Sequence, residues 1–124
     1  MDEFKKIGYH DVYFDNYKAF IDCCHYNLKN VICTKEGNEN IYILICAHYD
    51  TILNSNRKDS VSRSPGANDN ASGVSAILEI ARILYNQPQM KFGLQFVFFS
   101  GEEQDLLGSE HYAQYVKENG IQIF

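Results

Sequence analysis

Continuous apolar runs separated by polar stretches predict a series of short strands. Residues 41–47 and 94–99 are apolar almost throughout, which is typical of strands buried on both faces. Residues 30–34 predict a further strand, and we expect it to form a hairpin with 41–47 across the polar turn between them. Residues 9–14 are rich in strand-forming side chains, whereas 15–27 fit a helix and an extended chain equally well.

Two later segments show helical periodicity. The polar stretch 51–70 predicts a long loop, and the apolar residues after it recur at helical spacing until Pro88 ends the helix. Asn70 or Ser72 can cap the start of this helix. A last helix is predicted at 109–119. Strands interspersed with helices predict an α/β domain, in which helices pack on the faces of a sheet.

Composition and charge narrow the function classes. The chain has 124 residues, of which 45% are hydrophobic and 22% charged, the profile of one globular domain. Its formal net charge of −5 argues against nucleic acid or an anionic membrane surface as the main partner. No apolar run reaches the roughly 18 residues of a membrane span, and the opening residues lack the order of a secretory signal. A cytoplasmic location is therefore the default expectation, and nothing in the sequence indicates the oligomeric state.

The cysteines and most of the histidines do not form a clear site. Cys23, Cys24 and His25 are adjacent, so their side chains point in different directions, and a zinc site there is the less favoured interpretation. Small packing cysteines in a reducing compartment explain them better. His10 and His111 are interpreted as surface or helix-packing residues.

Three polar clusters follow a buried strand or precede a helix, where ligand sites form in open α/β sheets. His48 and Asp50 end one apolar run, Asp69 lies in a glycine-flanked turn, and Glu102 and Glu103 follow the Phe-rich run. A histidine can bind a metal while a carboxylate holds its other nitrogen. Of two adjacent acids, one can bind a metal and the other can accept a proton. Each cluster taken alone is also explained by a surface pair, a helix cap or a solvated loop.

The residues around these clusters form motifs in a fixed order. The segments are 46–50 (CAHYD), 64–74 (SPGANDNASGV), 96–104 (FVFFSGEEQ) and 106–109 (LLGS). In this order they resemble the dinuclear-zinc aminopeptidases of metallopeptidase family twenty-eight, with the motifs spread over 41–112. The resemblance implies a three-layer α/β/α sandwich with a mixed sheet and makes residues 1–124 part of a zinc peptidase catalytic domain.

The resemblance also implies a role for each candidate residue. His48 binds one zinc ion and is oriented by Asp50, while Asp69 bridges both ions of the family site. Glu103 binds the second ion, and Glu102 is the general base that activates the attacking water. The peptide bond after the bridging aspartate is implied to be cis. The substrates implied are peptides, which lose one residue at a time from the N-terminus.

The family site needs two further ligands, an aspartate and a late histidine, beyond the matched motifs. Residues 121–124 resemble the start of the strand that carries this aspartate, so we expect the domain to be incomplete at the C-terminus. Each zinc then retains two of its three protein ligands, whereas catalytic zinc usually has three. We therefore expect weak or absent peptidase activity from these 124 residues alone.

Three other interpretations stay open. A zinc carboxypeptidase or amidohydrolase shares the His-x-Asp and Glu-Glu patterns, although the turn at 66–73 favours the aminopeptidases. A glutaminyl cyclase is disfavoured because its corresponding turn differs. A metal-free, peptidase-like binding module is opposed by the presence of His48, Asp69, Glu102 and Glu103.

Overall fold

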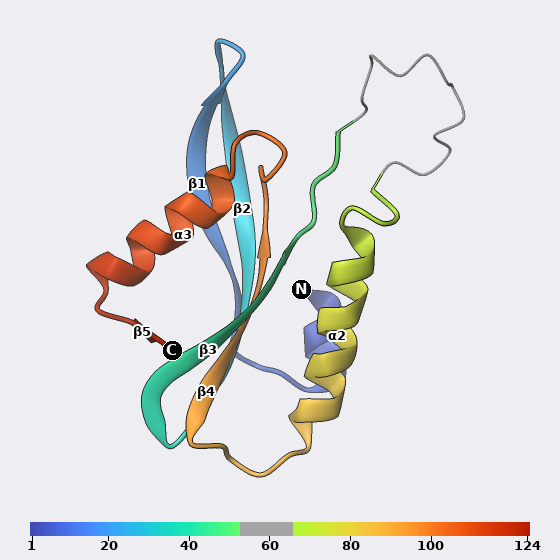
Figure 1. The fold of residues 1–124 in the computed structure, drawn as a ribbon, viewed down its shortest axis with the longest axis vertical. Coiled ribbons are helices and arrows are strands. Elements are labelled where there is room, and N and C mark those ends of the chain that lie inside the picture. The colour runs from blue at the N-terminus through green and yellow to red at the C-terminus, as the bar shows by residue number, and fades with distance from the viewer. Residues whose placement is uncertain (53–65) are drawn as a thin grey trace.

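The computed structural model describes residues 1–52 and 66–124, and these form a mixed sheet with helices on both faces (Figure 1). The part of the expected loop at 53–65, including Ser64 and Pro65 of the second motif, lies outside the described residues. None of the described helices is long and apolar enough to cross a membrane. In chain order the elements are α1 (Asp2–Ile7), β1 (Val12–Ile21), β2 (Cys24–Lys35), β3 (Glu39–His48), α2 (Ala71–Tyr85), β4 (Phe92–Phe99), α3 (Leu107–Glu118) and β5 (Gln122–Ile123).

The strands lie in the order β1-β2-β4-β3-β5. β4 is antiparallel to β2 and parallel to β3, and β5 adds a short parallel strand to the outer edge of β3. The expected hairpin between 30–34 and 41–47 is therefore wrong, because β4 lies between these two segments. β2 forms its hairpin with β1 instead, through a tight turn in which Asp22 and Cys23 have φ angles of 47° and 64°.

The two faces of the sheet are covered by different helices, which confirms the three-layer α/β/α arrangement. Side chains of β4 alternate between the two faces, as its extended backbone requires. Leu94, Phe96 and Phe98 belong to the core beneath α1 and α2. Val97 and Phe99 belong to the second core, together with Tyr112 of α3. In Figure 1, α2 and α3 lie on opposite sides of the twisted sheet. The prediction of burial on both faces is therefore correct for this strand.

The same prediction is wrong for β3. Ile43 and Cys46 are exposed in the structure, and Leu44 is only half-buried. The reason is that β5 pairs with only two residues of β3, so little of the outer edge of β3 is covered. An open apolar groove of about 370 Å³ results, lined by Leu44, Cys46, Phe99, Ser109, Tyr112, Ala113, Val116 and Ile123.

The helices begin and end close to where the sequence predicts them. α2 starts at Ala71, and the side chain of Asn70 caps it by accepting a 3.0 Å hydrogen bond from the backbone N–H of Gly73. α3 starts at Leu107, slightly earlier than expected. The ambiguous stretch 15–27 is extended and supplies the β1–β2 hairpin. The short helix α1 was not anticipated from the sequence pattern.

Candidate metal centre

The three polar clusters meet beyond the carboxyl ends of β3 and β4, next to the start of α2, in the upper half of the molecule in Figure 1. His48 is the last residue of β3 and lies opposite Phe99, the last residue of β4. Because β3 and β4 are parallel neighbours, the residues that follow them emerge side by side. Asp69 lies at the same end of these strands, in the turn that precedes α2. The Asp69–Asn70 peptide bond is cis, in agreement with the expectation from the resemblance.

Three of the candidate residues form a compact group of ligand atoms. One ligand atom each from His48, Asp69 and Glu103 lies within 4.8 Å of the other two. The closest approach is 2.9 Å, between Nε2 of His48 and Oδ1 of Asp69. Oε2 of Glu102 lies 3.7 Å from the same His48 nitrogen. Among residues 1–52 and 66–124, His48, Asp69 and Glu103 are the one such group of potential metal ligands.

The imidazole of His48 is held by the main chain that follows it. Its Nδ1 lies 3.2 Å from the backbone oxygen of Asp50, so this nitrogen carries the proton and donates it. The carboxylate of Asp50 is farther away, at 3.8 Å from Nδ1. The backbone carbonyl of Asp50 is thus the nearer partner of Nδ1, and an orienting role of the Asp50 side chain stays a prediction.

The Asp50 carboxylate instead holds the loop that carries the two glutamates. Its two oxygens accept hydrogen bonds from the backbone N–H groups of Glu102 and Glu103, each at 3.2 Å. A carboxylate that accepts two N–H groups is well satisfied without a cation of its own. Asp50 thus links the segment that follows β3 to Glu102 and Glu103, which follow β4.

The polar contacts at His48 create a need for a positive charge. Because Nδ1 of His48 donates to the backbone oxygen of Asp50, Nε2 of the neutral ring carries a lone pair. This lone pair faces Oδ1 of Asp69 at 2.9 Å. Two acceptor atoms at this distance repel each other unless a proton or a cation lies between them. Burial by itself lowers the pKa of His48, but Asp69, Glu102 and Asp50 outweigh it and raise the pKa above its ordinary value. Imidazole nitrogens and carboxylate oxygens are also ligands that zinc accepts, usually three of them in a catalytic site. The residues present therefore fit a zinc ion.

The side chains of the group differ in their access to solvent. The His48 side chain is 9% exposed, whereas the Asp69 side chain is 76% exposed. Two open cavities flank the group. One, of about 440 Å³, lies between Glu103 and the tip of the β1–β2 hairpin, and the other, of about 210 Å³, lies beside Asp50 and Asn70. A ligand can therefore approach the carboxylates from solvent while the imidazole stays covered.

The remaining histidines and cysteines lie elsewhere. His111 of α3 stacks on the ring of Tyr17, and its Nε2 lies 2.9 Å from Oδ1 of Asp15. This contact agrees with the interpretation of His111 as a helix-packing residue. Cys23 is exposed in the hairpin turn, and the ring of His25 packs against that of Phe20 nearby, tilted by 52°.

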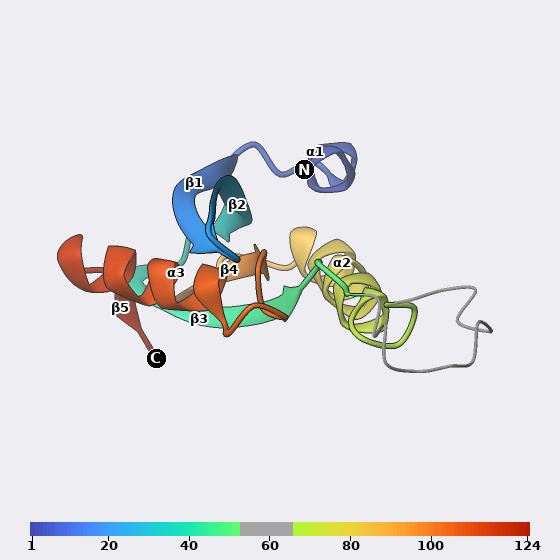
Figure 2. The same cartoon turned by 90° about the horizontal axis from the view of Figure 1, so that it is seen from above.

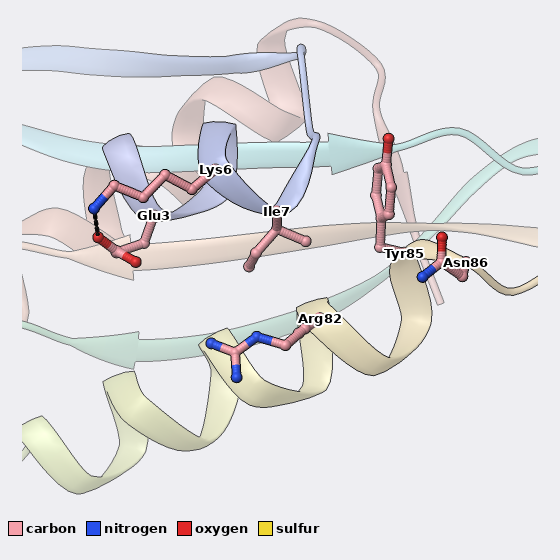
Figure 3. A pocket seen from close by; sticks show the side chains of 6 residues that line it. All are labelled: Glu3, Lys6, Ile7, Arg82, Tyr85 and Asn86. Carbon is pink, nitrogen blue, oxygen red and sulfur yellow. Dashed lines mark hydrogen bonds and ion pairs between the residues drawn. The ribbon is translucent and has the colours of Figure 1, made fainter.

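A further cavity lies between α1 and α2, away from the metal-ligand group. It measures about 310 Å³ and is lined by Glu3, Lys6, Ile7, Arg82, Tyr85 and Asn86 (Figure 3). Its charged groups already have partners, because Lys6 donates to Glu3 at 2.5 Å and Arg82 donates to Glu79 at 2.7 Å. No candidate site residue contributes to its lining.

Sequence reasoning missed one polar residue near the site. Asn30 of β2 is fully buried, and its side chain contacts the backbone at both Ser100 and Gly108. The signal available in the sequence was an amide at the start of the apolar run at 30–33, where a polar side chain requires buried partners.

Comparisons with known proteins are consistent with this geometry. The model of peptidase family M28 matches residues 30–124. Aminopeptidase YwaD of Bacillus subtilis is 38% identical over 104 residues, which cover 84% of this chain and 21% of the relative. A probable zinc metalloprotease of Pyrenophora teres f. teres is 40% identical over 99 residues, which cover 78% of this chain and 21% of that protein.

Solved structures share the fold. The aminopeptidase LapA of Legionella pneumophila has a TM-score of 0.70 and 27% identity, over 98% of this chain and 32% of its own. A glutaminyl cyclase of Fimbriiglobus ruber has a TM-score of 0.78 over 98% of this chain and 47% of its own, but at 23% identity this likeness concerns the fold alone. The chain spans about a fifth of the length of the curated relatives it matches. By the extent of the family match and the identity to these relatives, the chain belongs to peptidase family M28.

Proposed function

We propose that this chain is part of a zinc-dependent aminopeptidase and that His48, Asp69 and Glu103 hold the metal. The observation that carries the proposal is the convergence of these three ligand atoms within 4.8 Å, at the shared end of β3 and β4. The names of the relatives, an aminopeptidase and a zinc metalloprotease, support the same conclusion. The resemblance adds that Asp69 bridges two zinc ions and that the remaining ligands come from an aspartate and a histidine elsewhere.

The residues of the proposed site have different roles in catalysis. Bound zinc supplies a Lewis acid, which lowers the pKa of water and polarises the scissile carbonyl. Glu102 is not one of the three grouped ligands, and its partly exposed carboxylate lies 3.7 Å from Nε2 of His48. It can therefore accept the proton of the attacking water and later deliver it to the leaving amine. Asp50 holds the backbone of both glutamates in place.

Peptides are the substrates that this proposal implies. Removal of an N-terminal residue requires that the scissile carbonyl reach the zinc ligands and Glu102 together. The exposed Asp69 carboxylate and the open cavity beside Glu103 leave this approach free.

Zinc titration by calorimetry tests the metal centre directly. We expect the chain to bind zinc. His48→Ala should weaken this binding at least about tenfold, because it removes one of the three proposed zinc ligands. The Glu102→Gln variant should bind zinc as the wild type does and should abolish any hydrolysis of an aminoacyl-anilide. Glu110→Gln, on the exposed side of α3, is the matched control and should change neither property. Absence of zinc binding by the wild type would overturn the proposal.

Glutaminyl cyclase activity is the second candidate, because the glutaminyl cyclase of Porphyromonas gingivalis is 26% identical over 90% of this chain, with a TM-score of 0.70. An N-terminal glutaminyl peptide separates the two activities. An aminopeptidase releases free glutamine from it, whereas a cyclase releases ammonia and leaves a ring at the N-terminus. Release of a C-terminal residue would instead indicate a carboxypeptidase. Zinc binding without any turnover, in a version extended to the length of the relatives, would indicate a binding module.

A further inference from the structure

The buried amide of Asn30 joins three segments of the chain that are far apart in sequence. Asn30 is 0% exposed. Its Nδ2 donates to Oδ2 of Asp15 in β1 at 3.0 Å and to the backbone oxygen of Gly108 in α3 at 2.9 Å. Its Oδ1 accepts a 3.1 Å hydrogen bond from the backbone N–H of Ser100, just after β4. Both donors and the acceptor of the amide are thus used, which sets the orientation of the side chain.

This amide continues the sheet beyond the end of its backbone pairing. The register of β2 with β4 runs from Lys35 and Leu94 to Val31 and Phe98. Ser100 lies past that end, and its N–H is taken up by the Asn30 side chain. The Asn30 side chain therefore continues the hydrogen bonding of the sheet to Ser100, two residues before Glu102.

The backbone oxygen of Ser100 is held from the same side. The hydroxyl of Tyr17 in β1 donates to it at 2.8 Å. Both polar groups of the Ser100 peptide backbone are therefore bonded to side chains of the β1–β2 hairpin. Ser100 is two residues before Glu102, so the hairpin restrains one end of the segment that carries the two glutamates.

The partners of Asn30 are themselves restrained. The side chain of Asp15 is 10% exposed, and its second oxygen contacts His111, which stacks on Tyr17 with ring centroids 4.7 Å apart. Gly108 allows a close approach, since a Cβ atom there would lie 2.3 Å from the oxygen of Ser100 and 2.5 Å from Oδ1 of Asn30. The arrangement therefore requires a residue without a side chain at the start of α3.

The loop with Glu102 and Glu103 is consequently restrained by hydrogen bonds from two sides. On one side the Asp50 carboxylate accepts both glutamate N–H groups. On the other side Asn30 and Tyr17 hold Ser100. A shift at either support moves the glutamate side chains relative to His48 and Asp69.

We propose that Asn30 is a positioning residue that sets Glu102 and Glu103 by holding the Ser100 backbone against β1 and α3. For Glu103 this inference rests on the proposed zinc site. The restraint of the loop itself is a property of the metal-free chain, and the two parts can be measured separately.

Amide hydrogen exchange, followed by NMR on the metal-free chain, tests the restraint. In Asn30→Ala, exchange at Ser100, Glu102 and Glu103 should become at least about tenfold faster, because the loop loses one of its supports. Zinc affinity, measured by calorimetry, should fall by about 10–100-fold, the loss typical when a residue behind a metal ligand is removed. Asn30→Asp keeps an oxygen that accepts from the Ser100 N–H but loses the two donors to Asp15 and Gly108, so exchange at Ser100 should rise less than in Asn30→Ala.

Gln95→Ala is the matched control. Gln95 is a buried amide on β4, 5% exposed, and its side chain accepts a hydrogen bond from Tyr112 of α3. Its removal breaks a buried amide contact between the sheet and α3, as Asn30→Ala does, but it touches neither Ser100 nor the glutamates. This variant should be less stable while exchange at Glu102 and Glu103 and zinc affinity stay within about twofold of wild type.

Unchanged exchange at Ser100, Glu102 and Glu103 in a folded Asn30→Ala protein would overturn the inference. Should neither Asn30 variant fold, Tyr17→Phe decides, since it removes only the hydroxyl bonds to Ser100. It should speed exchange at Glu102 and Glu103 at least about threefold, and an unchanged rate would also overturn the inference. Failure of the wild type to bind zinc would contradict the proposed function, whereas the exchange comparison would still decide the restraint.

Discussion

Asp50 shows how one carboxylate can act on a site through the main chain of its neighbours. The imidazole of His48 is satisfied by the backbone oxygen of Asp50, which leaves both carboxylate oxygens for Glu102 and Glu103. Because the carboxylate bridges two loops, it couples the position of the histidine to that of the glutamates. This coupling depends on charge and on the number of acceptors, since an amide offers one oxygen where the carboxylate offers two.

Asp50→Asn should therefore weaken zinc binding without removing any ligand. We expect a loss of about 10–100-fold in zinc affinity, because one glutamate N–H loses its acceptor and faces an amide donor instead. Calorimetric titration measures this loss. Asp105→Asn is the control on the same loop, where asparagine tolerates the observed φ of 64°. An affinity of Asp50→Asn equal to that of the control would contradict the role assigned to Asp50.

Most individual site residues could be predicted from the sequence, because they follow apolar strands or precede a periodic helix. This pattern makes His48, Asp69, Glu102 and Glu103 candidates, and the family resemblance adds the role expected of each. The main-chain role of Asp50 could not be predicted in this way. It depends on the return of the segment after β4 to the end of β3, and no local pattern specifies that distance. The same limit applies to the three partners of Asn30.

At the scale of the elements, the turn before α2 serves two purposes. Asp69 points its carboxylate to His48, and Asn70, the next residue, caps the helix through Gly73. The start of α2 is thereby tied to the position of a candidate ligand.

Replacing this cap should lower stability in a predictable way. Asn70→Ala removes the acceptor for the Gly73 N–H and should lower the free energy of unfolding by about 1 kcal/mol. Urea unfolding followed by circular dichroism measures the change. Ser75→Ala, one turn further into α2, is the control, because its exposed hydroxyl bonds only to the helix backbone at Ala71. Equal losses in the two variants would show that the cap has no special role.

The short helix α1 could not be predicted because six residues carry too little periodicity. Its stability comes from packing. Phe4 is 0% exposed, with its ring centroid 5.9 Å from that of Phe96 and 5.5 Å from that of Phe98. Figure 2 shows α1 close to α2 at the same end of the molecule, where both cover this side of the sheet. The helix is thus specified by a tertiary contact rather than by its own sequence.

Phe4→Ala should accordingly be among the most damaging substitutions in the first ten residues. We expect the free energy of unfolding to fall by about 3–5 kcal/mol, because a large cavity opens between α1 and β4. Urea unfolding again provides the measurement. The Lys6→Ala variant changes an exposed residue of the same helix and should unfold close to wild type. A loss in Phe4→Ala below about 1 kcal/mol would mean that α1 is not docked as described.

At the scale of the whole molecule, the buried tyrosines set a limit on alkaline stability. Burial is the largest cause that raises the pKa of Tyr9 and of Tyr112 to about 12, from an ordinary value of 10.0. Burial also raises the pKa of the Cys33 thiol to about 12. Each of these groups is neutral in the folded chain at a pH where it ionises in the unfolded chain.

The resulting pH dependence has a definite sign. Below about pH 7.5 both states keep these groups protonated, so their contribution to stability is complete. As the pH rises towards 12, the unfolded chain releases protons that the folded chain retains, and the free energy of unfolding falls. Urea unfolding between pH 8 and pH 11 should show the decline. Tyr9→Phe should make the decline shallower, whereas Tyr26→Phe, at an exposed position in β2, should not.

The fold class could be predicted from the alternation of strands and helices, but the strand order could not. The short polar connection between 30–34 and 41–47 favoured a hairpin, and local spacing contains no information about a strand that arrives fifty residues later. The exposure of β3 could likewise not be predicted from its apolar run. It depends on how little of the outer edge β5 covers, which is a property of the assembled sheet.

The position of β4 in the middle of the sheet has a consequence for the order of events during synthesis. β1, β2 and β3 leave the ribosome first, but the strand that pairs with both β2 and β3 is complete only at Phe99. Until then the two apolar strands each present an open edge with no partner, apart from the local β1–β2 hairpin. Nascent chains that expose such edges are prone to wrong pairing with other chains. The interval during which residues 49–99 are being translated is therefore a period in which this chain needs protection from aggregation.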